Sequence, residues 1–250
     1  MKPLATSFLI AGLLSTVSAS AQNIFRFGIR GGFNRTTTTV AVAETGGQSS
    51  PFSYTRTADK SAISAWQAGI TAELIFGKIS LQPALVFTQK GERFHYYLAS
   101  YNLNALEYSS DNTGTTRANW LELPLNVVYT LHGTHGLQLF AGPYLAVAVG
   151  GRQDGINKIY SSSSPITPSQ YDDPIEYGRY ATNRRMDAGI NAGVGYRQGP
   201  FQMQLGYGLG LYNLHQAAVW STKPSSYQEF RSDDAYNRGF QLTGTYFFSL

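Results

Sequence analysis

The chain has 250 residues, with 19 Lys and Arg against 15 Asp and Glu, and a formal net charge of +4. Hydrophobic residues reach 42% and charged residues only 14%, which excludes disorder driven by charge. Because the chain has no cysteine, a disulfide scaffold, a cysteine zinc site, a thiol nucleophile and a lipid-modified N-terminal cysteine are excluded as well. The few positive charges form no basic stripe, so we expect no nucleic-acid partner.

The N-terminal segment has the layout of a secretory signal peptide. It combines a positive Lys2, an apolar run over 4–14 and the small-residue cleavage pattern Ala19-Ser20-Ala21. The apolar run is shorter than the ~18–20 residues that a membrane anchor helix needs. We therefore expect a signal peptide over 1–21, cleavage near Ala21-Gln22 and a single mature domain over 22–250. Export without cysteines suits the periplasm or the outer membrane.

Along the rest of the chain, apolar and polar residues alternate strictly, as in β-strands with two different faces. In the seventh segment, for example, Phe201, Met203 and Leu205 alternate with Gln202 and Gln204. No later stretch is long and apolar enough for a membrane helix. Eight segments follow the alternating pattern: 23–34, 65–76, 78–90, 119–131, 136–150, 184–197, 201–212 and 238–250.

The connections between these segments are short and long in turn. Gly77, residues 132–135 and residues 198–199 are tight turns. The other connections are long and rich in Ser, Thr, Asn and Gly: 35–64, 91–118, 151–183 and 213–237. Short periplasmic turns, long extracellular loops and an even strand number are typical of outer-membrane barrels. The sequence therefore predicts an all-β, eight-stranded, antiparallel up-and-down transmembrane β-barrel.

The composition of the two faces decides which one points outward. A soluble barrel around an apolar ligand cavity is the alternative, and it needs a charged exterior. Here the polar face carries mainly Gly, Gln, Asn, Ser and Thr, which suits a crowded interior. The apolar face carries almost no charge, and aromatic residues near the strand ends predict two girdles at the membrane interfaces. The predicted periplasmic girdle is Phe25, Phe76, Tyr129, Phe201 and Phe248, and the outer one is Phe33, Trp66, Phe87 and Trp120.

Charged residues on the polar face form the candidate site of the barrel interior. Five are positive and four negative, so we expect them to pair into a salt-bridged plug. An ion path is the alternative, although selective pores usually carry rings of one sign. The predicted network is Arg26, Arg30, Glu73, Lys90, Glu92, Glu122, Arg185, Asp187 and Arg197.

Signals for catalysis are weak. His95 and His215 lie just beyond strand ends, where a rim lipid or peptide hydrolase would also need a carboxylate and a serine in contact. His132 and His135 are too few for a zinc site. We expect no enzyme activity, no metal and no cofactor.

Several short motifs occur in an order that resembles the PorT-like outer-membrane β-barrel family of Gram-negative bacteria. They include Gly28–Asn34 (GIRGGFN), Gln89-Lys90-Gly91, Leu121-Glu122-Leu123-Pro124-Leu125, Gly142-Pro143-Tyr144, Asp187-x-Gly189 with Gly193-x-Gly195-Tyr196, and the Tyr246-Phe247 ending. The resemblance covers most of the mature chain but not the long connections. It implies an eight-stranded outer-membrane barrel without enzymatic activity.

The founding member of that family is an accessory of a protein-secretion system, which implies envelope or secretion-system proteins as partners besides outer-membrane lipid. We therefore expect a closed barrel with a structural, interaction or secretion-accessory role through its long loops. A small passive channel is the alternative function, and a rim hydrolase is the weaker one.

Overall fold

The computed structural model describes residues 24–39, 42–49, 52–133, 135–178, 181, 183–215 and 234–248. The predicted signal peptide and its cleavage site lie outside these residues. Within the described part, no helix has the length and apolar character needed to cross a bilayer.

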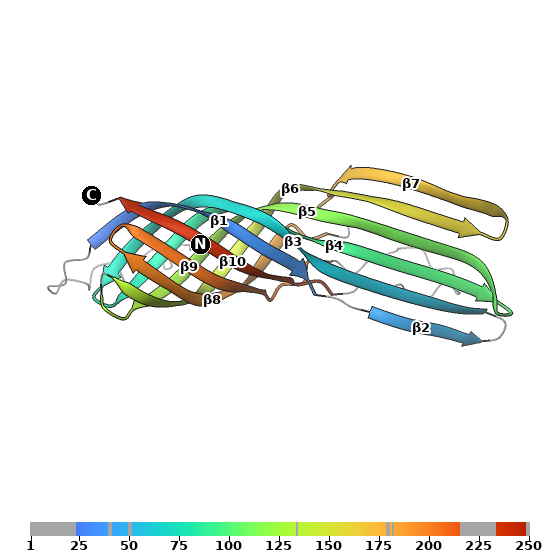
Figure 1. Cartoon of the computed structure of the whole chain (residues 1–250), viewed down its shortest axis with the longest axis horizontal. Helices are drawn as coiled ribbons and strands as arrows, with labels where there is room; N and C mark the ends of the chain where they lie inside the picture. Colours follow the sequence, from blue (N-terminus) through green and yellow to red (C-terminus); the bar gives the residue numbers. More distant parts are fainter. Residues whose placement is uncertain are drawn as a thin grey trace, which may run out of the picture.

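Ten antiparallel strands make up the described fold (Figure 1). In chain order they are β1 (Ile24–Thr38), β2 (Val42–Ser49), β3 (Phe52–Phe76), β4 (Ile79–Asn102), β5 (Ala105–Thr130), β6 (Gly136–Ser161), β7 (Ser164–Pro174), β8 (Met186–Gln198), β9 (Phe201–Gly210) and β10 (Asn237–Phe248).

Eight of these strands close into a ring in the order β1-β3-β4-β5-β6-β8-β9-β10. The ring closes because β1 pairs with both β3 and β10. Phe33 lies opposite Trp66 on one side and opposite Leu242 on the other. Closure leaves the ring without an unpaired strand edge, as a hydrocarbon environment demands. The predicted eight-stranded barrel is confirmed.

Side chains in the ring alternate between an exposed outer face and a buried inner face. Along β9, Phe201, Met203 and Leu205 are exposed, whereas Gln202 and Gln204 are buried. The core of the barrel is therefore polar, and its exterior is a band of Leu, Ile, Val and aromatic side chains. This inverted arrangement is the one that a lipid-facing barrel requires.

Tight turns join the strands at one end of the barrel. Gly77 has φ = 65° and Gly199 has φ = 59°, left-handed conformations that glycine adopts without strain. At the opposite end, β4 and β5 meet in a two-residue turn in which Leu103 (φ 50°) and Asn104 (φ 65°) are both left-handed. Two such residues in succession are typical of a type I′ hairpin.

Four barrel strands continue far beyond the ring. β3, β4, β5 and β6 contain 25, 24, 26 and 26 residues, more than twice the ~9–11 that cross a membrane. Their extensions pair with each other and with β2 and β7 to form an open sheet of six strands (Figure 1). It is here called the extracellular sheet, after the side of the membrane that the sequence predicts for the long connections. The prediction of long loops is wrong for residues 35–38, 42–49, 52–64, 91–102, 105–118, 151–161 and 164–174, which lie in strands.

Candidate functional site

The interior nearest the tight turns is closed by Glu73, which is 1% exposed. Arg197 Nη1 lies 2.6 Å from Glu73 Oε1 and 2.7 Å from Oε2, and Gln82 Nε2 donates to Oε1 at 2.8 Å. Arg26 Nη1 lies 3.8 Å from Oε2. Because β3 and β8 stand on opposite sides of the ring, the Glu73–Arg197 pair spans the full width of the lumen.

Arg197 is held by further contacts on its own side of the lumen. Its Nε donates to the carbonyl oxygen of Gly199 at 3.2 Å. Its guanidinium lies 4.7 Å above the centre of the Phe247 ring, which is 1% exposed. A planar cation stacked on an aromatic face loses little further freedom when it pairs with a carboxylate. The surroundings of Arg197 therefore hold its guanidinium group in position to pair with Glu73.

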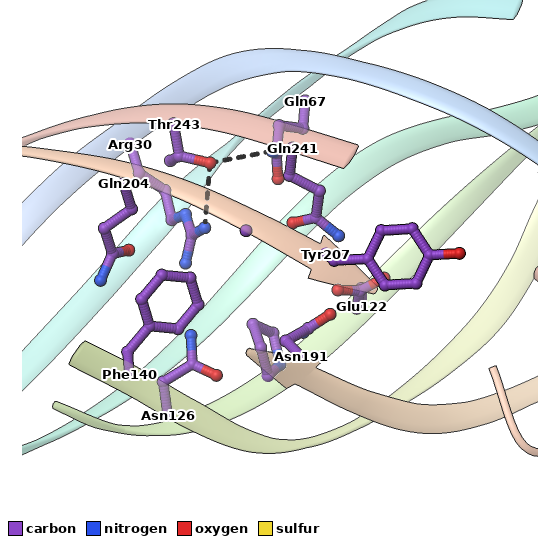
Figure 2. A pocket seen from close by; sticks show the side chains of 12 residues that line it. Arg30, Gln67, Glu122, Asn126, Phe140, Asn191, Gln204, Tyr207, Gln241 and Thr243 are labelled. Atoms are coloured by element: carbon purple, nitrogen blue, oxygen red, sulfur yellow. Dashed lines mark hydrogen bonds between the residues drawn. The ribbon is translucent and has the colours of Figure 1, made fainter. Parts of the chain in front are cut away.

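The middle of the lumen is filled by amide and aromatic side chains around Arg30 (Figure 2). Arg30 Nη2 donates to Thr243 Oγ1 at 3.5 Å, and Gln67 Nε2 donates to the same oxygen at 3.0 Å. Phe140 and Asn191 point into the same space. Only about 10 Å³ is left empty between these groups, roughly the space of a single water molecule.

A second buried ion cluster lies further along the barrel, centred on Lys90. Lys90 Nζ lies 2.6 Å from Glu122 Oε2 and 3.5 Å from Asp187 Oδ2. The ammonium also lies 4.5 Å above the centre of the Tyr144 ring. Asp187 Oδ2 accepts hydrogen bonds from the Tyr144 hydroxyl at 3.2 Å and from Asn237 Nδ2 at 2.8 Å. Side chains from five strands therefore meet around one buried cation.

A third cluster joins β1, β3 and β4 on one side of the barrel mouth. Lys60 Nζ lies 2.8 Å from Glu92 Oε1 and donates to Thr38 Oγ1 at 2.7 Å. Glu92 Oε2 accepts from the Thr38 amide at 2.9 Å and from its hydroxyl. Lys60 comes from a segment that the sequence predicted to be a loop. The β-bulge in β3 between Ala62 and Gln67 reverses the side-chain alternation and turns Lys60 inward, so no simple periodicity identifies it.

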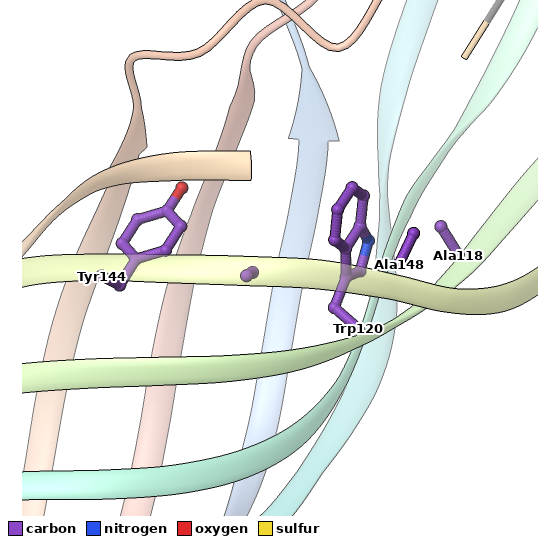
Figure 3. Packing of buried hydrophobic residues seen from close by; sticks show 5 residues of the cluster. Ala118, Trp120, Tyr144 and Ala148 are labelled. Atoms are coloured by element: carbon purple, nitrogen blue, oxygen red, sulfur yellow. The ribbon is translucent and has the colours of Figure 1, made fainter. Parts of the chain in front are cut away.

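Beside this cluster, the mouth of the barrel contains a cavity of about 130 Å³ whose lining combines Lys90 and Glu92 with aromatic side chains. Trp120 and Tyr144 point to the same side of the wall (Figure 3), and Tyr177 and Leu214 pack against the cluster they form with three alanines. Trp120 and Tyr177 meet edge to face with ring centroids 6.5 Å apart. Burial raises the pKa of Tyr177 to about 12, so its phenol stays neutral.

Two predicted site residues lie elsewhere. Trp120 is 3% exposed inside the barrel, so its place in the outer girdle is wrong. Trp120 is two residues from Glu122 on β5, so its side chain lies on the same face of the strand as that of Glu122, which faces inward. Arg185 is exposed ahead of the first residue of β8, so its place in the lumen network is also wrong. Its neighbour Arg184 lines the mouth cavity and stacks on Tyr212 at 5.1 Å.

The other predicted residues fall on the faces assigned to them. Arg26, Arg30, Glu73, Lys90, Glu92, Glu122, Asp187 and Arg197 point inward, and all but the half-buried Arg26 and Arg30 are buried. Phe25, Phe33, Trp66, Phe76, Phe87, Tyr129, Phe201 and Phe248 lie on the outer wall. Trp66 stacks on Phe87 at 5.4 Å, as expected for an interfacial pair.

The two rim histidines do not share a site. His95 Nε2 lies 2.9 Å from Asp111 Oδ1 on the outer face of the extracellular sheet. His215 lines the mouth cavity. Among the residues that the structure describes, no group of three or more His, Asp and Glu side chains could hold a metal ion.

Residues 20–216 match the family described as outer membrane protein beta-barrel domain. Among curated proteins, no sequence matches the chain. Among solved structures, the outer membrane protein OprG from Pseudomonas aeruginosa is similar, with 12% identity, a TM-score of 0.35 and coverage of 91% of this chain and 98% of that one. OpdL and OpdQ from Pseudomonas aeruginosa match at TM-scores of 0.12, with 9% and 10% identity, covering 92% and 90% of this chain and 100% and 97% of theirs.

Proposed function

Because the chain belongs to the outer membrane protein β-barrel domain family, we propose that it is a closed, non-enzymatic barrel whose extracellular sheet binds another envelope protein. One observation carries this proposal. The extracellular sheet continues four barrel strands and ends at β2, whose outer edge pairs with no described strand. An unpaired edge strand offers a row of N–H and C=O groups to an extended partner segment.

The two edges of the extracellular sheet differ in a way that selects β2. Strand β7 contains Pro165, Pro168 and Pro174, and proline has no N–H group to donate to a neighbouring strand. Strand β2 contains no proline over its eight residues. Prolines at an edge are a common protection against strand addition, so β7 is protected and β2 is open.

The interior supports a role other than transport. Two ion clusters with both signs of charge cross the lumen, at Glu73–Arg197 and around Lys90, and the space around Arg30 admits about one water molecule. The motif order that resembles the PorT-like family favours a secretion-system or other envelope protein as the partner. Under this proposal the barrel anchors and orients the extracellular sheet at the cell surface.

Site-specific photo-crosslinking in intact cells tests this function. A crosslinking amino acid replaces Thr45 in β2 or, as the matched control, Gln170 in β7, and an affinity tag is placed in the 162–163 turn. We expect a stoichiometric crosslinked protein from the Thr45 position only, and its loss when Thr45→Pro is combined with a crosslinker at Ala43. Equal crosslinking from both edges, or none from β2, would contradict the proposal.

A further inference from the structure

The mouth cavity lies between the inner faces of three barrel strands and two connecting segments. Phe94 on β4, Trp120 on β5 and Gln153 on β6 line it from adjacent strands. Tyr177 and Leu214 line it from the segments that follow β7 and β9. The ion clusters described above use none of these five side chains, so closure of the lumen does not account for the cavity.

One polar atom in the wall of the cavity lacks a partner. Trp120 is 3% exposed, and its indole Nε1 is buried without a hydrogen-bond partner among the residues that the structure describes. An indole N–H group can only donate, and a buried donor that stays unsatisfied costs free energy. A donor of this kind in the wall of a cavity favours a ligand that brings an acceptor atom.

The charged side chains of the lining are engaged elsewhere. Lys90 is paired with Glu122, and Glu92 is paired with Lys60. The guanidinium group of Arg184 stacks at 5.1 Å on an aromatic ring that is not among the lining residues. The described lining therefore directs no unpaired carboxylate or ammonium group at a ligand, which favours a neutral one.

The size and the composition of the cavity suit one six-membered ring that carries hydroxyl groups. Its volume is about 130 Å³, and a cavity of about 150 Å³ holds one benzene molecule. Trp120 and Tyr177 meet edge to face at 74°, and the face of an aromatic ring carries partial negative charge, so the C–H groups of a sugar ring pack on it. Thr116 and Gln153, directly opposite each other on β5 and β6, add a hydroxyl and an amide for sugar hydroxyl groups.

We infer that the mouth cavity binds a single neutral sugar ring, either a free hexose or the last residue of a glycan. A sugar oxygen accepts the hydrogen bond of the Trp120 indole N–H, and the C–H side of the ring packs on the aromatic side chains. Aromatic walls with a few polar groups are the usual composition of a small-molecule site. None of the described residues that line the cavity belongs to β2, so this site is separate from the edge strand.

Saturation-transfer difference NMR on the purified full-length barrel, in a detergent without a sugar headgroup, tests this inference. The probes are glucose, galactose, mannose and N-acetylglucosamine, each at about 10 mM, above the roughly millimolar dissociation constant that a ligand of this size reaches. We expect at least one of the four sugars to bind the natural chain.

The test variant is Trp120→Phe, which keeps an aromatic ring but removes the N–H group. The matched control is Trp66→Phe, the same substitution on the outer wall. The control should bind the sugar as the natural chain does, and Trp120→Phe should bind it about tenfold more weakly, as the loss of a buried hydrogen bond implies. If circular dichroism shows that Trp120→Phe loses its β-structure, Gln153→Leu takes its place and should also weaken binding.

A last arm separates the two sources of the sugar. The methyl glycoside of the bound sugar should bind equally well if the cavity takes the last residue of a glycan, and should be rejected if it takes a free hexose. Binding of none of the four sugars would overturn the inference and leave the cavity to water. Equal binding by the natural chain and by the folded cavity variant would overturn it as well.

Discussion

Arg197 reaches across the whole interior of the barrel to Glu73, with its Nη1 atom 2.6 Å from Glu73 Oε1. The two residues belong to β8 and β3, which stand on opposite sides of the ring. Both side chains are almost fully buried, so the pair forms a bar across a space that a solute would have to pass. The same contact therefore links stability to closure of the lumen.

Removing the charge of Glu73 should destabilise the barrel strongly. In Glu73→Gln the Arg197 guanidinium stays buried without its carboxylate, a change that typically costs about 3–5 kcal/mol. Equilibrium urea unfolding in lipid vesicles measures this loss. The control is Glu107→Gln at the far end of the extracellular sheet, which keeps an acceptor for Asn102 and should change stability by less than about 0.5 kcal/mol.

The double variant Glu73→Gln/Arg197→Gln tests whether the cost comes from this pair. Residues in direct contact do not act independently. We expect the double variant to lose less stability than the sum of Glu73→Gln and Arg197→Gln, because neither charge is then left alone. Strictly additive losses would show that the two side chains act separately.

Trp120 and Trp66 should respond differently to the membrane. Trp66 stacks on Phe87 on the outer wall, whereas Trp120 is buried in the mouth cluster. In single-tryptophan variants with Trp220→Phe and either Trp66→Phe or Trp120→Phe, brominated lipid should quench Trp66 fluorescence strongly and Trp120 fluorescence only weakly. Strong quenching of Trp120 would place that ring in the girdle after all.

The extracellular sheet should protect its backbone from exchange with solvent. Between Glu92 and Asn102, strand β4 pairs with β3 on one side and β5 on the other. Amides in such a central strand open only with the sheet. Hydrogen–deuterium exchange should be far slower for these amides than for the turn at Leu103 and Asn104. Equal rates in the two segments would mean that this part of β4 is a loop.

The Arg152–Asp172 pair gives a prediction about pH. The hydrogen bond from Arg152 lowers the pKa of Asp172 below its ordinary value of 3.8. A lowered pKa in the folded state means that the pair contributes stability above the unfolded pKa and loses it as the pH falls through the folded one. An NMR titration should give Asp172 a midpoint below 3.8 that rises towards this value in Arg152→Gln. An identical midpoint in both proteins would argue against the hydrogen bond.

The barrel could be predicted from the sequence because its two faces meet such different surroundings. Residues such as Leu205 and Gln204 alternate between lipid and a polar lumen, and this contrast produces a strict period of two. The same alternation places Glu73, Lys90 and Glu122 inside. It also places Trp120 inside. The position of a residue in the alternating pattern therefore predicts its face of the strand better than its being an aromatic residue near a strand end.

The extracellular sheet could not be predicted in this way. Both of its faces carry many polar residues, as in the Ser109–Thr116 part of β5, so the alternation fades although the strands continue. The bulge between Ala62 and Gln67 then reverses the parity of β3 and brings Lys60 to Glu92. The alternating pattern also fails for Arg185, because β8 begins one residue after it and the pattern holds only within a strand.

Single-channel recording tests most directly the claim that the lumen is closed. The purified mature chain is reconstituted in a planar bilayer, and current is recorded for the natural protein and for Glu73→Ala/Arg197→Ala. We predict no discrete conductance steps from the natural protein, since two buried ion clusters, at Glu73–Arg197 and around Lys90, span its lumen. Discrete steps from the natural protein that shift in size in the double variant would contradict the account and identify a channel.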